Sequence, residues 1–518
     1  MRGAGEEGES RLSKAWISAA LLLLAGAAFL AYYPVLDNGF YIIDDQRHLA
    51  NGMGFPFPNH YFRPGQEWSF RLLWPLAGTD PFPYYLTGLL FHLAATVLTT
   101  LLAWKVLKER WAALAAGLVF ATLYAPSQAV LWIGAHLGVQ SVTFALASLL
   151  FWIAFLERGG WFRWAGSLVF GVLAMCFKES GVNLLPFMLV VYLRFKGPRA
   201  LLRPRNWLPW IPLVLFAAYV TWHAVTVPGG IGLEVRMSGP LVLLDRLLRS
   251  IGHMPIPLNF RRHRAGLQVI GLVFPLLPFL GALLAARARA GKGPLPPAAG
   301  YAAAAVAVGL LLAGHAAVLP VEGEATGERD YYDAAPGFAL MLAVLFSQAR
   351  ILLAGKGKVL RSLPWIGLLA WCGINVLSLH KVEAWKYDAP SRHVERLVRA
   401  TGRLLEKAPR GKTLFFLDPP MRDVRDFERI LEIYYGADPG RIRQIWYDPR
   451  GERLRRRIRE EKDLVCLRWR ESPPAWIPFE PGGWKWLEKW KPFWWPSPLD
   501  DPHLSHKIRC LEYHLPGG

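Results

Sequence analysis

The stretch "YLTGLLFHLAATVLTTLLAW", residues 85–104, decides the fold class, because it runs for twenty residues without Asp, Glu, Lys or Arg. A helix needs about 20 consecutive apolar residues to cross the hydrocarbon core of a bilayer. The run ends abruptly in "KVLKER", residues 105–110, where charged side chains return. We therefore predict a transmembrane helix over residues 85–104.

Ten further apolar runs of similar character predict transmembrane helices for the same reason. The chain has 518 residues, of which 53% are hydrophobic, more than an ordinary soluble protein of this length carries. We predict an all-α polytopic membrane protein with about 11 transmembrane helices. The other spans are expected near 15–33, 111–126, 134–156, 162–178, 181–195, 207–227, 266–286, 298–320, 334–349 and 363–380.

The formal net charge of +20 is concentrated in short loops between the apolar runs, so we interpret it as a topology signal and not as a nucleic-acid surface. Basic loops such as "KVLKER" and "RFKGPRALLRPRNW" alternate along the chain with the loops that hold "IIDDQRHL", "FKES" and "VEGEATGERDYYD". The positive-inside rule assigns residues 1–14 and the basic loops to the cytoplasm. The acidic loops are then extracytoplasmic. The predicted location is the bacterial inner (plasma) membrane.

Two segments outside the spans are long enough to matter. The first outer loop, residues 34–84, is unusually long for a connection between spans, which is typical of a functional loop. Residues 15–380 form the predicted transmembrane domain, and an odd number of spans places residues 381–518 outside the cytoplasm. In this last segment "KTLFFLD" (412–418) and "DLVCLRW" (463–469) predict strands, and residues 391–408 have helical periodicity. We predict a small C-terminal α/β extracytoplasmic domain, where a disulfide between Cys466 and Cys510 stays open.

The first outer loop begins with "NGFYIIDDQRHLANG", residues 38–52, which sets Asp44 and Asp45 directly after an apolar run. Two adjacent carboxylates repel each other and gain nothing from a low-dielectric surface. One interpretation is a solvated loop or an acidic helix N-terminus. The other is a general base for an acceptor hydroxyl. The following stretch, "YFRPGQEWSFRLLWPLAG" (61–78), predicts a helix lying at the membrane interface.

Further candidate residues stand at the ends of later spans. Lys178 and Glu179, in "FKES", are costly beside a membrane unless they are paired or used, so either a mutual ion pair or a phosphate-binding role for Lys178 fits. Arg329 and Tyr332, in "GERDYYDAAPGFALML" (327–342), fit either a phosphate grip or an interfacial aromatic belt. A lone His such as His136 is more often a packed residue than a ligand.

No His/Cys spacing of a structural metal site, no Gly-rich nucleotide loop and no nucleophile elbow occurs in the sequence. No metal ligand is therefore assigned. A requirement for a divalent cation stays open, and no cofactor follows from the residues.

These motifs occur in an order that resembles the membrane glycosyltransferases of the C-type fold (GT-C). The similarity covers about residues 15–350 and includes bacterial relatives of the protein O-mannosyltransferases and the transmembrane half of the tetratricopeptide-bearing O-mannosyltransferases. It rests on six stretches taken together: "NGFYIIDDQRHLANG", "YFRP", "DPFPYYLTGLLFHLAATVL", "VLWIGAHLGVQSVTFALASLLF", "MCFKESGVNLLP" and "GERDYYDAAPGFALML".

The resemblance implies an enzyme that transfers a sugar from a polyprenyl-phosphate carrier to an extracytoplasmic acceptor, with inversion at the anomeric carbon. It assigns the general base to Asp44 and a supporting role to Asp45. The acceptor, a protein hydroxyl, a lipid or a polysaccharide, is left open. Its implied partners are the lipid-linked sugar donor, membrane lipids and that acceptor, and no nucleic acid. The substrate-binding residues that we predict are Arg63, His136, Lys178, Glu179, Arg329 and Tyr332, with Arg63, Lys178 and Arg329 on the carrier phosphate.

The chain departs from the family pattern at two places. Relatives commonly carry a His-Pro-x-His-x-Glu element where this chain has "YAPSQAV" (124–130), and they often read "ERYLYLP" where this chain has "ERDYYDAAP" (328–336). The first departure keeps open a non-catalytic scaffold. Two further functions also stay open: an O-antigen-type polymerase or ligase, and a flippase or transporter of lipid-linked sugars.

Overall fold

The computed structural model describes the helical region of the chain nearly throughout and the C-terminal region in pieces. The described residues are 14–40, 45–54, 62–226, 240–256, 264–289, 297–315 and 328–388, followed by 391–392, 394–396, 398–399, 402, 414–417, 433–434, 443–446, 465–471, 474–479 and 509–513. They divide into two compact units. The first comprises Met1–Leu36, Pro58–Ser69 and Phe82–Ala384, and the second comprises Asp37–Phe57, Phe70–Pro81 and Trp385–Gly518.

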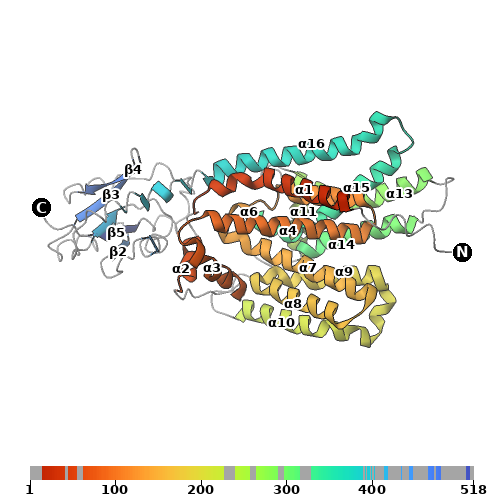
Figure 1. The fold of residues 1–518 in the computed structure, drawn as a ribbon, viewed down its shortest axis with the longest axis horizontal. Helices are drawn as coiled ribbons and strands as arrows, with labels where there is room; N and C mark the ends of the chain where they lie inside the picture. The colour runs from red at the N-terminus through yellow and green to blue at the C-terminus, as the bar shows by residue number, and fades with distance from the viewer. Residues whose placement is uncertain are drawn as a thin grey trace. The chain divides into compact units, whose positions relative to one another are not determined.

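The first unit is a bundle of helices, in which α1 and α16 run side by side (Figure 1). Its longer helices are α1 (Lys14–Tyr32), α4 (Phe82–Leu107), α5 (Arg110–Thr122), α7 (His136–Arg158), α8 (Trp161–Phe177), α9 (Leu184–Lys196), α10 (Ile211–Thr226), α11 (Pro240–His253), α12 (Arg264–Val273), α13 (Leu277–Arg289), α14 (Pro297–His315), α15 (Ala335–Leu353) and α16 (Lys358–Val382). Short elements between them are η1 (Tyr33–Asp37), α6 (Gln128–Leu131), η2 (Ile133–Ala135), η3 (Glu179–Asn183), η4 (Pro198–Leu202), η5 (Pro204–Trp210), η7 (Phe274–Leu276) and η8 (Glu328–Asp333). A π-helical turn, η9 (Glu383–Asp388), follows α16 and ends in the second unit. Helix α3 (Pro64–Ala77) begins in this unit and ends in the second.

Each predicted membrane span contains helix, and the match confirms a helical polytopic protein. Among the described residues, six helical stretches are long and apolar enough to cross a membrane. The helices α5 and α8, and Tyr301–His315 within α14, are apolar but shorter. The number of eleven spans therefore stays a prediction. The six long stretches are Ala15–Asp37, Phe82–Leu107, Ile133–Arg158, Ala265–Arg287, Ala335–Leu353 and Lys358–Asp388.

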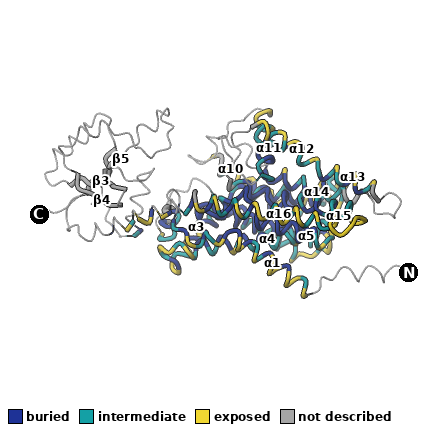
Figure 2. The backbone as a smooth tube through the Cα atoms, turned by 90° about the horizontal axis from the view of Figure 1, so that it is seen from above, coloured by how far each residue is buried: buried dark blue, intermediate teal, exposed yellow. Residues whose placement is uncertain are grey.

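The core of the bundle is built around α5, which is buried along all of residues 112–122. Helices α1, α4, α15 and α16 pack around it. Figure 2 shows the buried segments inside the bundle and exposed segments along its outer helices. The exposed apolar side chains of α1 and α16, among them Leu22 and Leu377, are typical of a surface that faces lipid. Both cysteines with described side chains, Cys176 and Cys372, are buried free thiols.

Helix α15 approaches α14 closely at Gly337, because a Cβ there would lie 2.2 Å from the backbone nitrogen of Leu311. We expect Gly337→Ala to lower the free energy of unfolding by about 1–3 kcal/mol, the usual cost of overpacking. The matched control is Gly367→Ala on α16, where a Cβ would meet nothing within 4 Å. Unfolding of the purified protein in detergent, followed by heat or denaturant, measures both. Equal stability of the two variants would contradict this expectation.

The second unit contains α2 (Asp45–Gly52), the end of α3 and a five-stranded sheet of order β2-β5-β1-β3-β4. The strands are β1 (Leu414–Leu417), β2 (Arg443–Trp446), β3 (Val465–Glu471), β4 (Pro474–Phe479) and β5 (Arg509–Tyr513). Strands β1 and β3 run parallel, and the other paired strands run antiparallel. The two strands predicted from sequence are present as β1 and β3. The α/β domain as a whole, with its bounds 381–518, stays a prediction.

The strand register gives the positions of Cys466 and Cys510, whose pairing in a disulfide the sequence leaves open. Cys510 pairs with Ile445 of β2, and Cys466 pairs with Phe479 of β4. Strand β1 stands between β5 and β3 in the sheet order, but β3 and β5 also pair directly, at Val465 and Tyr513. A disulfide between Cys466 and Cys510 therefore stays open.

Charged side chains gather at opposite ends of the helix bundle. At one end, Lys105 at the end of α4 forms an ion pair with Glu157 at the end of α7, and Glu109, just before α5, pairs with Arg350 near the end of α15. At the other end lie η8, which precedes α15, and the loop after α8. An ion pair between Asp330 and Lys178 joins these two segments. Of the predicted site residues, Arg63, Lys178, Glu179 and Tyr332 lie at this second end.

Candidate active site

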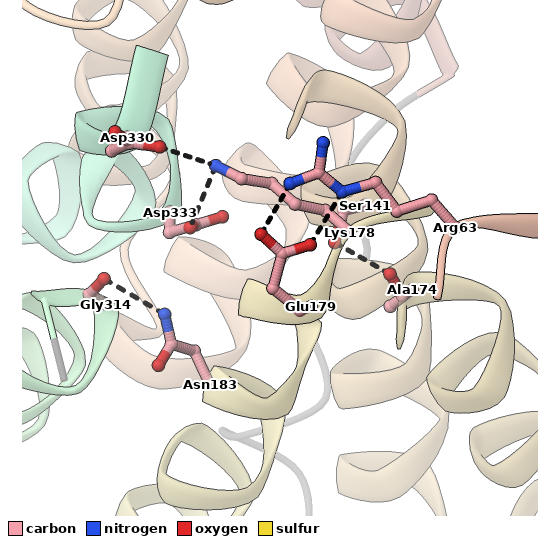
Figure 3. Close-up of polar contacts among 9 residues, drawn as sticks. All are labelled: Arg63, Ser141, Ala174, Lys178, Glu179, Asn183, Gly314, Asp330 and Asp333. Carbon is pink, nitrogen blue, oxygen red and sulfur yellow. Dashed lines mark hydrogen bonds and ion pairs between the residues drawn. The ribbon is translucent and has the colours of Figure 1, made fainter. Parts of the chain in front are cut away.

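Three segments that are far apart in the sequence meet through ion pairs at this second end (Figure 3). Arg63, just before α3, donates from Nε to Oε2 of Glu179 at 2.7 Å and from Nη2 to Oε1 at 2.6 Å. This two-point geometry is the strongest form of an arginine–carboxylate pair. Both side chains are about a fifth exposed, at 18% and 19%.

Lys178 points away from its neighbour Glu179 and toward η8 (Figure 3). Its Nζ donates to Oδ1 of Asp330 at 2.9 Å and lies 3.9 Å from Oδ2 of Asp333. The alternative of a mutual Lys178–Glu179 pair therefore does not describe this loop, since each residue takes its partner from another segment. We refer to Arg63, Lys178, Glu179, Asp330 and Asp333 as the ion-pair cluster.

The loop between α8 and α9 owes its shape to local contacts. Lys178 leaves α8 in an extended conformation, with φ −150° and ψ 140°, and η3 then turns back onto the helix. The carbonyl of Ala174 accepts hydrogen bonds from Ser141 Oγ at 2.9 Å and from the backbone nitrogen of Lys178 at 3.3 Å. Only glycine fits at Gly181, because a Cβ would lie 2.7 Å from the backbone of Ala174.

The same loop is held from two further sides. Asn183 Nδ2 donates to the carbonyl of Gly314 at the end of α14, at 3.1 Å. On the other side, the first turn of α3 packs so closely that a Cβ on Gly65 would lie 2.8 Å from the Phe177 ring. That contact brings Arg63 next to Glu179. The cluster thus stands on packed helix ends and not on an isolated loop.

Helix η8 is anchored by Tyr332, which is fully buried. Its hydroxyl lies 2.7 Å from Nδ1 of His92 in α4, and Nε2 of His92 lies 3.3 Å from the carbonyl of Ala121. Because a carbonyl only accepts, Nε2 carries the proton and Nδ1 accepts the hydrogen bond from Tyr332. The Phe120 ring stacks on His92 with centroids 5.5 Å apart. This anchor fixes where Asp330 and Asp333 stand.

The cluster separates the proton affinities of its members. Burial lowers the pKa of Lys178, but Asp330 and Asp333 raise it by more, so Lys178 stays protonated. Burial raises the pKa of Glu179, but Arg63 and then Lys178 outweigh it and lower that pKa to about 2. For Asp333 burial dominates and raises the pKa to about 6, although Lys178 opposes the shift. Two carboxyl groups of one cluster thus differ widely, a pattern typical of acid–base sites.

The raised pKa of Asp333 predicts a pH dependence of stability. The folded protein holds this proton more tightly than the unfolded chain, whose Asp pKa is 3.8. The free energy of unfolding therefore falls as the pH rises from about 4 to about 6, by roughly 1–3 kcal/mol from this group. Asp333→Asn lacks this loss, so its stability relative to the natural protein should improve over that range. Thermal unfolding of both proteins at pH 4, 5, 6 and 7 measures it, and parallel curves would contradict it.

The other predicted site residues lie elsewhere or outside the described side chains. Asp44 falls outside the described residues, and Asp45 is the buried first residue of α2, in the second unit. An acidic residue is favourable at that helix position, so the interpretation of an acidic helix N-terminus holds for Asp45. The backbone of Arg329 lies in η8, but its side chain is not described. His136 is buried, and its Nε2 lies 3.0 Å from the carbonyl of Val130.

The structure adds Asp330 and Asp333 to the site, which the sequence analysis did not select. Both belong to "ERDYYD", at positions where the chain departs from the family pattern. The sequence signal that could have pointed to these carboxylates is Lys178, because an amino group beside a membrane needs a counter-ion. Among the described residues, no group of three or more His, Cys, Asp or Glu side chains has an arrangement that could hold a metal ion.

Parts of this chain are similar in sequence to protein O-mannosyl-transferases. Protein O-mannosyl-transferase TMTC2 of Mus musculus is 33% identical over 129 residues, which are 24% of this chain and 15% of that protein. Protein O-mannosyl-transferase Tmtc1 of Drosophila melanogaster is 30% identical over 183 residues, 30% of this chain and 21% of the relative. The chain resembles the O-mannosyl-transferases. The predicted similarity to GT-C membrane glycosyltransferases is thereby confirmed, although the matches span only 15–21% of the length of these two relatives.

The solved structure of arabinosyltransferase EmbB from Mycobacterium smegmatis matches with a TM-score of 0.34 and 16% identity, over 74% of this chain and 42% of EmbB. No protein-family model matches the chain.

Proposed function

We propose that the protein is an integral membrane glycosyltransferase that moves a sugar from a polyprenyl-phosphate carrier to an extracytoplasmic acceptor. The observation that carries the proposal is the ion-pair cluster. It joins residues from "YFRP", "FKES" and "ERDYYD", three of the stretches on which the resemblance rests, across 116 and 152 positions of sequence. Motifs that meet in space at one end of a helix bundle support a shared chemical task.

In the proposed reaction, Asp44 accepts the proton of the acceptor group while the acceptor oxygen attacks the anomeric carbon. The bond from that carbon to the carrier phosphate breaks, and the polyprenyl phosphate leaves from the opposite face. Attack and departure on opposite faces give inversion. Asp45 supports the base through its neighbouring charge.

The carrier phosphate is assigned to Arg63, Lys178 and Arg329. Arg63 suits this task best among the described residues, because its side chain is partly exposed and guanidinium groups bind phosphate through paired hydrogen bonds. A phosphate that binds there has to share the guanidinium with Glu179. A phosphate that reaches Lys178 has to share that amino group with Asp330. The proposal places these groups and the acidic pair on the extracytoplasmic side of the bacterial inner membrane.

The testing experiment uses the purified full-length chain in lipid nanodiscs with radiolabelled polyprenyl-phosphate sugars. We expect release or transfer of the label together with formation of free polyprenyl phosphate, and binding of the carrier is measured in parallel. Binding without turnover would overturn the transferase assignment and favour a flippase or a scaffold. Turnover only with diphosphate-linked oligosaccharides would favour a polymerase or ligase.

A further inference from the structure

The connection from the end of α9 to the start of α10, residues 194–210, carries five Lys or Arg residues and no Asp or Glu. The indole nitrogen of Trp164, in the first turn of α8, donates to the carbonyl of Pro209 at 3.1 Å. Helix α8 ends next to Lys178, a member of the ion-pair cluster, so its first turn and this connection lie at the opposite end of the bundle. The connection is therefore remote from the candidate active site.

The basic side chains of this connection have no carboxylate counter-ions among the described residues. Arg194, Lys196, Arg199 and Arg203 are exposed, and none of them forms an ion pair within the part of the chain that the structure describes. Two carboxylates at the same end of the bundle, those of Glu109 and Glu157, are already paired with basic residues outside the connection. Four exposed cations gathered in this way favour an anionic ligand.

Local contacts hold the connection in one shape. The side chain of Asn206 donates from Nδ2 to the carbonyl of Ala200 at 2.8 Å, and Trp207 donates from Nε1 to the carbonyl of Leu201 at 2.9 Å. Both hydrogen bonds fold η5 back onto η4. Trp210, at the end of η5, is buried against aromatic rings of α7 and α9. The cations therefore stand on an ordered surface that is packed onto the bundle.

Apolar side chains are exposed between these cations. Leu202 is 82% exposed, Leu208 is 61% exposed and Trp207 is 48% exposed. The apolar exposure continues into α10 at Val214 and Leu215, where it is typical of a helix that faces lipid. Arginine next to exposed leucine and tryptophan suits the boundary between lipid headgroups and acyl chains. A soluble polyanion, by contrast, would match only the cations.

We propose that this surface binds the headgroups of anionic phospholipids. The arginines bind the phosphodiester through paired hydrogen bonds, and the leucines enter the adjacent acyl chains. The inference goes beyond the proposed function and does not depend on it, because no residue of the ion-pair cluster takes part. We refer to the surface as the headgroup platform, which comprises Arg194, Lys196, Arg199, Leu202, Arg203, Trp207 and Leu208.

The test measures lipid binding to the purified full-length protein in a neutral detergent. The probes are phosphatidylglycerol, which is anionic, and phosphatidylcholine, which has no net charge. Native mass spectrometry gives the affinity for each lipid, and the unfolding temperature is measured with and without lipid. One double variant, Arg199→Gln with Arg203→Gln, removes two cations of the headgroup platform. A second, Leu202→Asn with Leu208→Asn, removes its exposed aliphatic side chains.

The matched control is Lys356→Gln with Lys358→Gln, because it removes the same charge from two exposed lysines at the turn from α15 to α16. We expect the natural protein to bind phosphatidylglycerol more tightly than phosphatidylcholine. The arginine variant should bind phosphatidylglycerol about 10–30-fold more weakly, the effect of two cations lost at an anionic surface. The leucine variant should bind both lipids more weakly. Without lipid, all variants should unfold at the temperature of the natural protein, since the substituted side chains are exposed.

Equal affinity of the natural protein for the two lipids would overturn the inference. An equal loss in the lysine control would also overturn it, because net charge and not the headgroup platform would then decide binding. Unchanged lipid binding in the leucine variant, together with binding of a DNA duplex that the arginine substitutions abolish, would overturn it in favour of a soluble polyanion.

Discussion

Asp44→Asn should lower sugar transfer by about 10²–10⁴-fold while binding of the polyprenyl-phosphate sugar survives, the range expected when a general base is removed. Asparagine keeps the size and hydrogen-bonding capacity of the side chain but cannot accept a proton at neutral pH. The acceptor group then attacks without assistance, whereas the donor contacts at the cluster are untouched. Single-turnover transfer of a radiolabelled sugar and equilibrium binding of the same donor separate the two effects.

Asp45→Asn is the matched control for that variant, because it removes the adjacent charge and keeps the same local backbone. Asp45 begins α2 and is buried, and asparagine is also favourable at a helix N-terminus, so unfolding of Asp45→Asn is measured alongside transfer. We expect a much smaller loss of transfer than for Asp44→Asn. Equal loss in both variants would assign the base function to the pair, and unchanged transfer in both would remove it from the acidic pair altogether.

The helical part of the fold could be predicted from sequence because lipid imposes a simple rule. Runs such as 85–104 and 334–349 must be helices, since only a helix satisfies its own backbone hydrogen bonds in hydrocarbon. The helix at 61–78 could be predicted because apolar residues recur along one of its sides. In the structure, α3 exposes Trp68, Leu72 and Leu76 in successive turns. The number of spans did not follow, because α5 and α8 are shorter than a bilayer requires.

The site could be predicted only in part, because sequence shows which groups need partners but not which partners they take. Lys178 and Glu179 are adjacent, which invites a mutual pair. Adjacent residues leaving a helix in an extended conformation point in different directions, so each finds a partner from another segment. Asp330 and Asp333 face Lys178 only because Tyr332 anchors η8 on His92, a contact across 240 positions that no local pattern encodes.

Lys178→Met should lower the free energy of unfolding by about 3–5 kcal/mol, the cost of breaking a buried ion pair by removing one partner. Methionine fills the space of the lysine stem but leaves Asp330 and Asp333 without their cation in a buried setting. Unfolding in detergent measures the loss, with Lys105→Met as the control, since its pair with Glu157 is about a third exposed on the lysine side. The control should lose about 1 kcal/mol or less.

A triple variant distinguishes a structural from a functional role for this lysine. When Asp330→Asn and Asp333→Asn accompany Lys178→Met, no buried carboxylate remains without a partner, so much of the stability should return. Sugar transfer should not return, because the variant still lacks the amino group that the proposed donor site assigns to the carrier phosphate. Recovery of transfer together with stability would show that the cluster only holds the helix ends together, and the donor would then have to bind elsewhere on the outer face.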